Sequence, residues 1–340
     1  MKTSDFDYVL PPELIAQTPL VNRSDSRLLL VHPGDHEFKE FVFSDLTELL
    51  NPGDVLVRNN TRVLPARLFG IKEETGAKVE VLLLKAIPEG WQALCGNARV
   101  IKEGTWITFG NGELKAQCIR VGEAGIRDFS LVHEGDFFSV LDQLGQMPLP
   151  PYIHKKLSEN QRYNTVYAKM AGSAAAPTAG LHFTPQLFEQ LKAKGIEVVD
   201  LTLHVGLGTF RPLKSEEILD HHMHSEWYSL SEQSSLMLQK AKEEGRRIIA
   251  IGTTSCRTLE TIWRRHGCFL PECGESDLFL YPGNPPQSID GLITNFHLPK
   301  STLILLVSAL ASRETILNAY QYAIEHKFRF YSFGDAMLIL

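Results

Sequence analysis

Two patterns of hydrophobic and polar positions divide the chain. From about Val63 to Phe138, apolar and polar residues alternate in short runs such as Val79–Leu84. Within this region Asn111-Gly112 favours a tight turn, so residues 106–121 are predicted to form a β-hairpin. Such runs predict a small all-β unit over residues 61–147, resembling a barrel. Met147–Tyr152, rich in proline, is the expected crossing point between domains.

After this segment, helical stripes alternate with short buried runs. Arg247–Ile251 reads as a strand followed by a helix to about His266, and Leu292–Phe296 reads as another strand before a helix beginning near Ser301. Ser229 and Glu232 predict a capping box for a helix ending at Gly245. This alternation predicts an α/β fold with a mostly parallel sheet and flanking helices.

Two glycine-flanked turns carry histidines on either side of one predicted helix–strand unit. Thr184 is a suitable N-cap, Gly195 suits a left-handed C-cap, and Ile196–Val205 reads as a strand. Open α/β sheets bind ligands at the carboxyl ends of their strands, so both turns are predicted site segments. Their candidate residues are Thr178, Gly180, His182 and Phe183 in the first turn, and His204, Gly206, Gly208, Thr209 and Phe210 in the second.

Three further polar turns follow predicted strands. The run Gly252–Arg257, with Thr253, Thr254 and Ser255, resembles a nucleotide-binding turn at a helix N-terminus. The other interpretation, a glycine turn with Ser255 capping the helix, stays open. Asn295, His297 and Ser301 surround the next strand end, and Asn59 with Arg62 form a polar corner after an apolar strand. Several such turns favour one shared ligand site.

The run His221–Glu226 suggests two kinds of chemistry. On a strand, His222, His224 and Glu226 would share a face and form a possible metal-ligand set. The spacing lacks the HExxH pattern, so acid–base chemistry or substrate hydrogen bonding by His224 and Glu226 is favoured. No GxSxG, reactive-cysteine or kinase signature appears, which argues against a serine or cysteine hydrolase.

Composition narrows the class of protein. The 340 residues include 34 basic and 40 acidic side chains, giving a net charge of −6, so nucleic acid would need a local basic patch. The five cysteines form no CxxC pair, which fits a reduced, cytoplasmic setting. The N-terminal segment lacks a secretory pattern, and His297, Pro299 and Lys300 interrupt the most apolar run. We therefore expect a soluble cytoplasmic protein without a membrane span.

Taken together, the ordered motifs resemble the S-adenosylmethionine:tRNA ribosyltransferase-isomerase family of queuosine biosynthesis. The resemblance covers nearly the whole chain. The motifs that carry it are Asp5–Asp7, Pro52–Asp54, Asn59–Arg67, Met147–Tyr152, Tyr163–Tyr167, both histidine turns, His222–Trp227, Gly252–Glu260, Thr294–Thr302 and Phe330–Leu338. Two segments depart from the family pattern: Asn284–Gln287 lacks an aromatic pair, and Gly96–Arg99 lacks a basic patch.

The resemblance implies an α/β catalytic domain formed by residues 1–60 and 148–340, with the β-barrel-like domain inserted at 61–147. The implied reaction transfers and isomerises the ribosyl group of S-adenosylmethionine onto 7-aminomethyl-7-deazaguanine at the tRNA wobble position. The product would be epoxyqueuosine-tRNA, with adenine and methionine released. S-adenosylmethionine is then a co-substrate, tRNA the macromolecular partner, and no resident cofactor, metal or membrane is expected. We expect a monomer.

This chemistry needs a base, because the sulfonium acidifies the adjacent ribose carbon. The expected catalytic residues are His182, His204, His224 and Glu226, with the three imidazoles converging around the donor. The expected substrate-binding residues are Asn59, Arg62, Thr178, Gly180, Phe183, Gly206, Gly208, Thr209, Phe210, Thr253, Thr254, Ser255, Arg257, Asn295, His297 and Ser301. Two alternatives remain: a metal-dependent hydrolase built on His222, His224 and Glu226, and a non-catalytic tRNA-binding protein.

Overall fold

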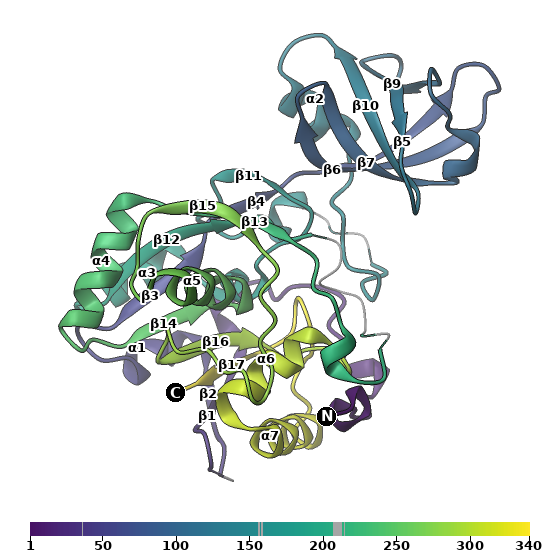
Figure 1. The fold of residues 1–340 in the computed structure, drawn as a ribbon. Coiled ribbons are helices and arrows are strands. Elements are labelled where there is room, and N and C mark those ends of the chain that lie inside the picture. Colours follow the sequence, from purple (N-terminus) through teal and green to yellow (C-terminus); the bar gives the residue numbers. More distant parts are fainter. Residues whose placement is uncertain (36, 156, 158, 207–212, 214) are drawn as a thin grey trace.

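The computed structural model describes every residue except 36, 156, 158, 207–212 and 214. Figure 1 shows an α/β domain with a separate barrel above it, joined by the chain after β4 and the chain after α2. The helices are α1 (Leu46–Leu49), α2 (Phe137–Leu144), α3 (Pro185–Ala193), α4 (Glu232–Glu243), α5 (Thr253–His266), α6 (Thr302–Ala311) and α7 (Arg313–Glu325). Short 3-10 turns include η3 (Arg23–Asp25), η4 (Phe43–Asp45), η6 (Asn160–Tyr163) and η7 (Thr178–His182).

The α/β domain is built on a nine-stranded sheet in the order β15-β13-β12-β3-β14-β16-β17-β1-β2. Its strands are β1 (Arg27–Val31), β2 (Lys39–Val42), β3 (Val55–Asn59), β12 (Glu197–Leu203), β13 (Glu226–Leu230), β14 (Ile248–Ile251), β15 (Glu272–Ser276), β16 (Gly291–Asn295) and β17 (Ala336–Ile339).

The α/β architecture is confirmed, but the sheet is mixed and not mostly parallel. The four central strands, β12, β3, β14 and β16, run parallel, and β17 pairs in parallel with β1. The remaining four pairings, including β16 with β17, are antiparallel. Strands β16 and β17 pair antiparallel although α6 and α7 lie between them in the chain, so the helix–strand alternation in the sequence overestimates the parallel share.

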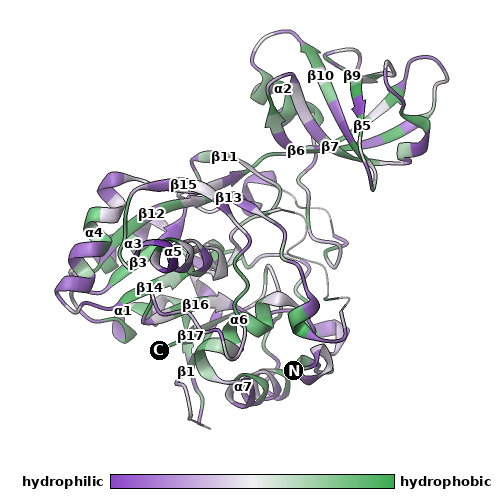
Figure 2. Ribbon diagram, in the orientation of Figure 1, coloured by the Kyte–Doolittle hydropathy of each residue, from purple (hydrophilic) through white to green (hydrophobic). Residues whose placement is uncertain are grey.

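Alternating side chains on the strands pack against helices on both sides of the sheet. Leu29 and Val57 belong to the core beneath α4, α5, α6 and α7, whereas Leu28 and Leu56 belong to the core beneath α1 and α3. Figure 2 shows the consequence for helix composition, since α6 is largely hydrophobic and α4 is largely polar. The sheet is therefore covered by a helical layer on each face.

Residues 67–133 form the predicted barrel. Its strands are β5 (Arg67–Lys72), β6 (Lys78–Ile87), β7 (Gly90–Gly96), β8 (Trp106–Phe109), β9 (Leu114–Val121) and β10 (Ile126–His133), closed in the order β10-β7-β6-β5-β8-β9. The expected hairpin over 106–121 is β8 and β9, with Ile107 paired to Ala116. The barrel has its own buried core, to which α2 contributes Val140 and Leu141.

The chain crosses between the two domains at one place. Strand β4 (Thr61–Val63) pairs with β11 (Met170–Ser173) on the side of the α/β domain, and the barrel begins only at Arg67. Arg67 then forms an antiparallel bridge with Gln146, just before the proline-rich segment that returns to the sheet. The two crossing strands are thus held together by backbone hydrogen bonds.

Several local predictions are confirmed, and one helix cap is not where the sequence placed it. Thr184 Oγ1 accepts a hydrogen bond from the Leu187 amide at 3.1 Å, and Gly195 has a φ of +85°. Helix α4 is capped by Ser231, because Ser229 lies inside β13. Among the described residues, no single helix is long and apolar enough to cross a membrane, and α6 and α7 pass that test only as a pair bent by 112°.

Candidate functional site

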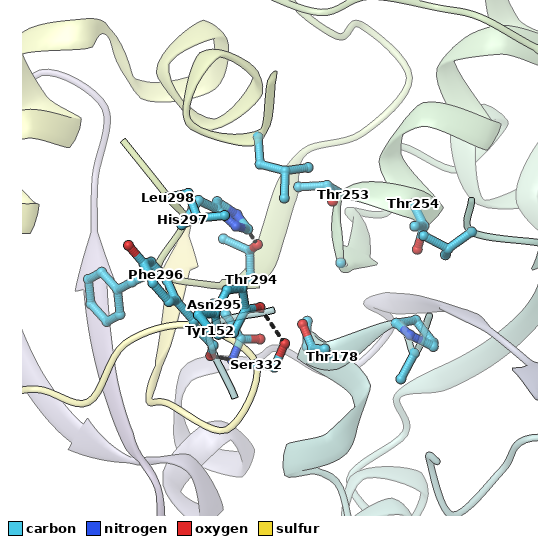
Figure 3. Close-up of a pocket in the computed structure, with 17 residues that line it drawn as sticks. Tyr152, Thr178, Thr253, Thr254, Thr294, Asn295, Phe296, His297, Leu298 and Ser332 are labelled. Atoms are coloured by element: carbon cyan, nitrogen blue, oxygen red, sulfur yellow. Dashed lines mark hydrogen bonds between the residues drawn. The ribbon is translucent and has the colours of Figure 1, made fainter. Parts of the chain in front are cut away.

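Several predicted segments meet at one edge of the sheet and line a common cavity, which we call the strand-end cavity (Figure 3). Strands β12, β14 and β16 run parallel, so their carboxyl ends lie at the same edge. The polar lining consists of Tyr152, Thr178, Thr253, Thr254, Thr294, Asn295, His297, Tyr331 and Ser332. The enclosed space is about 50 Å³, far less than a typical ligand pocket, so a nucleoside-sized molecule fits only if side chains move.

Hydrogen bonds inside this cavity fix some polar groups and leave others unpaired. His297 Nε2 lies 2.9 Å from Thr294 Oγ1, and Asn295 Nδ2 donates to the Tyr331 carbonyl at 3.0 Å. Thr254 Oγ1 is buried without a hydrogen-bond partner among the described residues, whereas the Asn295 side chain interacts with the His182 ring and raises its pKa. Buried polar atoms are nearly always paired, so the Thr254 hydroxyl is the group that a ligand or water would satisfy.

The run Gly252–Arg257 opens α5 beside the cavity. Gly252 is the N-cap, with a φ of +85°, so its backbone turns in a conformation that favours glycine. The first amides of a helix have no partner within it, and they favour polar or anionic groups. Ser255 Oγ instead donates to the Ile251 carbonyl at 2.8 Å and is fully buried. The capping interpretation of Ser255 is therefore wrong, and Ser255 does not reach the cavity.

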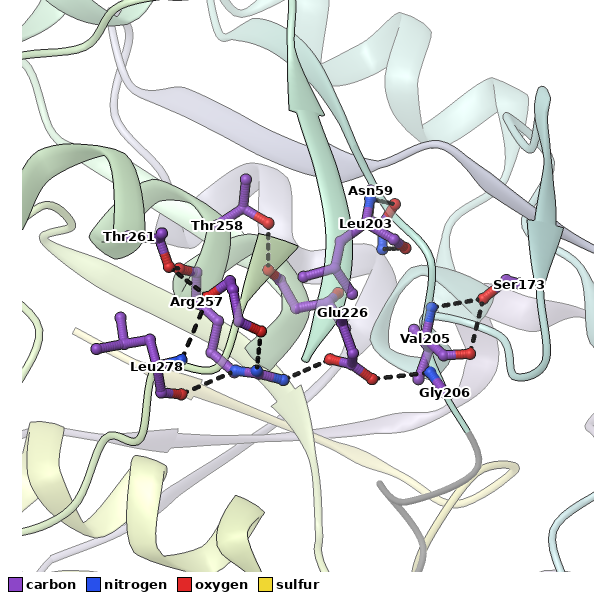
Figure 4. Close-up of polar contacts among 12 residues, drawn as sticks. Asn59, Ser173, Leu203, Val205, Gly206, Glu226, Arg257, Thr258, Thr261 and Leu278 are labelled. Carbon is purple, nitrogen blue, oxygen red and sulfur yellow. Dashed lines mark hydrogen bonds and ion pairs between the residues drawn. The ribbon is translucent and has the colours of Figure 1, made fainter. Parts of the chain in front are cut away.

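A buried ion pair lies next to the second histidine turn (Figure 4). Arg257 Nη1 lies 2.5 Å from Glu226 Oε2, and Glu226 Oε1 accepts a hydrogen bond from the Gly206 amide at 2.8 Å. Arg257 also donates to the carbonyls of Leu278 and Ser276. In this arrangement Glu226 anchors the backbone where β12 leaves the sheet, and Arg257 neutralises its charge.

The three expected catalytic imidazoles have different surroundings. His182 lies in η7, stacked on Phe43 at a ring distance of 4.8 Å, with Nδ1 2.7 Å from Ser26 Oγ. His204 follows β12, where its ring stacks on Trp227 at 5.0 Å. His224 is exposed and precedes β13. Their convergence around the donor and the catalytic role of each stay predictions.

Burial sets the protonation of the buried imidazoles. It lowers the pKa of His182 to about 4, and the charges of Arg23 and Arg329 act in the same direction. It also lowers the pKa of His297 to about 3 and, less strongly, the pKa of His204. All three rings are therefore neutral near pH 7. Among the three rings, His204 is the half-buried one, and its pKa is lowered the least.

The surroundings of His204 define which ring nitrogen is free. Nδ1 lies 2.8 Å from Thr61 Oγ1, and that hydroxyl is 3.4 Å from the Met170 carbonyl. If the hydroxyl donates to Met170, it accepts from Nδ1–H, which leaves Nε2 as a proton acceptor. A Cβ at Gly172 would lie only 2.8 Å from Nε2, so glycine is required for this approach. The His204 ring and Gly172 thus pack against each other at the end of β12.

The remaining predicted residues have mainly structural positions. Asn59 is buried, and its amide bridges the Leu203 backbone with bonds of 2.9 and 3.0 Å. Phe183 belongs to the core, and Ser301 caps α6 through the Ile304 amide. Arg62 is exposed on β4, and Gly180 packs under Tyr167. Gly208, Thr209 and Phe210 lie outside the described residues.

Four polar residues of the strand-end cavity were not predicted from the sequence as site residues: Tyr152, Thr294, Tyr331 and Ser332. Tyr152 OH lies 2.7 Å from Ser332 Oγ, which joins the proline-rich segment to the turn before β17, and Tyr331 packs against Tyr152. Both turns were present among the motifs that carry the resemblance. Neither strand periodicity nor spacing indicates that they meet, because they are separated by 180 residues.

A metal centre on His222, His224 and Glu226 finds no support in this geometry. The two histidines are exposed, and Glu226 is bound to Arg257. Across the part of the chain that the structure describes, no group of three or more His, Cys, Asp or Glu side chains is arranged to hold a metal ion. The residues present therefore do not form the ligand set that this alternative requires.

Comparisons with known proteins match the whole chain. A family model described as queuosine biosynthesis protein covers residues 3–339. The chain belongs to this family. Two proteins of the family, from two strains of Staphylococcus epidermidis and both named S-adenosylmethionine:tRNA ribosyltransferase-isomerase, are 55% identical over 342 residues and covered completely on both sides. The crystal structure of S-adenosylmethionine tRNA ribosyltransferase from Thermotoga maritima is 36% identical, with a TM-score of 0.58, covering 99% of this chain and 100% of that chain. These matches confirm the resemblance that the motifs indicate.

Proposed function

We propose that this protein is an S-adenosylmethionine:tRNA ribosyltransferase-isomerase. It transfers and isomerises the ribosyl group of S-adenosylmethionine onto the aminomethyl group of 7-aminomethyl-7-deazaguanine at the tRNA wobble position. Epoxyqueuosine-tRNA forms, and adenine and methionine leave. The observation that carries this proposal is the 55% identity, over the full length of both chains, to relatives with that name. A binding protein without catalysis has no comparable support.

The strand-end cavity is the proposed place for the reacting part of the donor. The Thr254 hydroxyl is the buried polar group that still needs a partner, and Tyr152 with Tyr331 supplies aromatic surface. Adenine offers both hydrogen-bonding edges and a flat face, which suits a site with hydroxyl, amide and aromatic groups. Because the enclosed space is small, the methionine end would lie toward the rim.

We assign proton removal to His204. The sulfonium acidifies the ribose carbon bonded to it, so a neutral base can take a proton from that carbon while adenine leaves from the other end of the ribose. His204 precedes Val205, which lines the strand-end cavity, and its Nε2 is free as an acceptor in the tautomer described above. His182 and His297 are weaker bases, since burial lowers their pKa values much further.

Glu226 and Arg257 are proposed to position this site and not to exchange protons. Their mutual ion pair and the bond to the Gly206 amide hold the backbone directly after His204 and Val205. S-adenosylmethionine is consumed as a co-substrate, so we expect no resident cofactor or metal. A tRNA acceptor places the enzyme in the cytoplasm, and we expect it to act as a monomer.

Direct product analysis tests the proposal. The purified protein is incubated with S-adenosylmethionine and tRNA that carries 7-aminomethyl-7-deazaguanine at the wobble position. Mass spectrometry of the nucleosides should show epoxyqueuosine, with adenine and methionine released in equal amounts. Unmodified tRNA after incubation with active, folded protein would overturn the proposal, and adenine released without change in the tRNA would restrict it to donor cleavage.

A further inference from the structure

Arg23 and Arg162 form a common wall between two cavities that are not part of the candidate site. Arg23 and Arg162 line a small space beside His182, which we call the histidine cavity. They also line a groove of about 760 Å³ between the crossing segments of the barrel and residues 159–168, which we call the arginine groove. Ser332 lines both the histidine cavity and the strand-end cavity, so these two spaces are neighbours.

Both guanidinium groups are held by neutral partners. Arg23 donates to the carbonyls of Leu181 at 3.1 Å and Asn164 at 3.0 Å, and Arg162 donates to the Leu20 carbonyl. Each arginine thus reaches into the segment that carries the other. Among the described residues, neither forms an ion pair with a carboxylate. The fold therefore keeps two positive charges fixed without neutralising them.

The two positive charges lie close enough to affect each other. Burial lowers the pKa of Arg23 to about 10, and the like charge of Arg162 adds to that shift. Like charges held together without a carboxylate favour an anion as their partner. The buried His182 ring, which also lines the histidine cavity, interacts with the Asn295 side chain.

We propose that Arg23 and Arg162 bind a backbone phosphate of the RNA strand next to the nucleotide being modified. This inference rests on the proposed function. A wobble base that enters the active site is flanked by its own phosphates, and the arginine groove lies beside the histidine cavity, which in turn shares Ser332 with the strand-end cavity. Arginine forks suit phosphate oxygens, and backbone contacts of this kind fix the register of RNA without reading its sequence.

A phosphate fits this place better than the carboxylate of the donor. The histidine cavity encloses only about 20 Å³, which leaves no room for a methionine side chain, whereas the groove is long and open. The groove also contains two carboxylates, Asp142 and Glu159. Asp142 lies 3.9 Å from Arg62, and neither carboxylate is paired with Arg23 or Arg162. The wall formed by Arg23 and Arg162 is thus the cationic part of the arginine groove.

Arg162→Gln tests this inference, because among the described residues the Arg162 side chain makes one hydrogen bond, to the Leu20 carbonyl. Binding of the precursor-carrying tRNA is measured at several salt concentrations, and KM is measured separately for tRNA and for S-adenosylmethionine. We expect tRNA affinity to fall about tenfold and the slope of log Kd against log salt to decrease by about 1. The KM for S-adenosylmethionine should not change, and Arg162→Lys should restore part of the affinity.

Arg313→Gln is the matched control, since Arg313 is an exposed arginine on α7 outside the three cavities. Thermal melting verifies the fold of each variant, and Arg162→Met, which keeps the aliphatic stem, replaces the glutamine variant if that one unfolds. Unchanged tRNA affinity and salt slope in a folded variant would overturn the inference. So would a rise confined to the KM for S-adenosylmethionine. Wild-type protein that binds tRNA but forms no product would contradict the proposed function, while its binding data would still test the phosphate contact.

Discussion

Arg257 and Glu226 form an ion pair inside the protein, with side chains only 8% and 5% exposed and a separation of 2.5 Å. The pair connects the first turns of α5 to the start of β13, and through Gly206 it reaches the end of β12. Three segments of the predicted site are therefore joined by one carboxylate. Its contribution is to hold the backbone in place around the strand ends.

Removal of this carboxylate should destabilise the fold. Glu226→Ala leaves the Arg257 charge buried without its partner, and breaking a buried pair in this way costs about 3–5 kcal/mol. The free energy of unfolding in urea measures the effect. Glu197→Ala is the control, because Glu197 is 44% exposed beside Arg246 and its loss should cost less than about 1 kcal/mol. Equal effects of the two substitutions would contradict a structural role for the buried pair.

Thr254→Val tests the strand-end cavity as the donor site. The substitution removes a hydroxyl that has no partner among the described residues, so the fold should keep its stability. If the donor supplies the missing partner, loss of one hydrogen bond should raise the KM for S-adenosylmethionine up to about tenfold. Steady-state kinetics of adenine release measure this KM. Thr258→Val is the control helix position, since its hydroxyl already bonds to the Thr254 carbonyl. An unchanged KM in the Thr254 variant would remove this residue from the donor site.

His204→Gln should lower kcat by about 100-fold or more, as expected for loss of a general base. The KM values for tRNA and S-adenosylmethionine should change little, because a general base acts in the transition state and adds little to the binding of the substrates. Burial lowers the pKa of His204 below its ordinary value of 6.5. The neutral, active form therefore persists below pH 6.5, and wild-type activity should decline only when the pH falls further.

The matched control for His204 is His133→Gln, in the barrel at the end of β10. It should leave kcat and the acidic limb of the pH profile unchanged. A His204 variant with normal turnover would exclude this residue as the base and return the question to the other imidazoles.

His182 makes stability depend on pH. Its folded-state pKa of about 4 lies below the unfolded value of 6.5, so the unfolded chain binds a proton first as the pH falls. Its stabilising effect is complete above pH 6.5 and disappears progressively between pH 6.5 and 4, with a total of roughly 3 kcal/mol. Urea unfolding across this pH range should show the decline in the wild type and a flatter curve in His182→Asn. Identical curves would contradict burial of a neutral ring.

Gly180→Ala should strain the first histidine turn. A Cβ there would lie 2.0 Å from the Tyr167 hydroxyl and 2.8 Å from Thr165 Cγ2, both buried. Overpacking of this kind typically costs about 1–3 kcal/mol, visible as a lower Tm. Gly245→Ala, where nothing lies within 4 Å of the added atom, should cost only the roughly 1 kcal/mol of its left-handed backbone. A Gly180 variant as stable as the wild type would show that Tyr167 can move aside.

Local signals in the sequence predicted most elements, whereas contacts over long separations needed the structure. Thr184, Gly195 and the Asn111-Gly112 turn act within a few residues, so their patterns were sufficient. The direction of β17 against β16 depends on the path of the chain between them, and apolar runs carry no direction. The sheet was therefore expected to be more parallel than it is.

The same contrast between local signals and contacts over long separations applies to the candidate site. Strand ends with polar residues were found from the sequence, and Thr178, Thr254 and Asn295 do share one cavity. The sequence could not show that Glu226 is paired with Arg257, since 31 residues separate them and either could have faced a substrate. Nor could it show that stacking turns His204 toward Trp227 while His224 stays at the surface.

The bridge between Arg67 and Gln146 has a consequence for how such a protein arises and can be changed. Because the chain leaves and returns at hydrogen-bonded neighbours, the whole barrel occupies the position of a single surface loop of the α/β domain. Its removal or exchange leaves every strand of the nine-stranded sheet in register. The molecule is in this sense modular, and a barrel from another relative could be grafted at residues 67 and 146 as an interchangeable part.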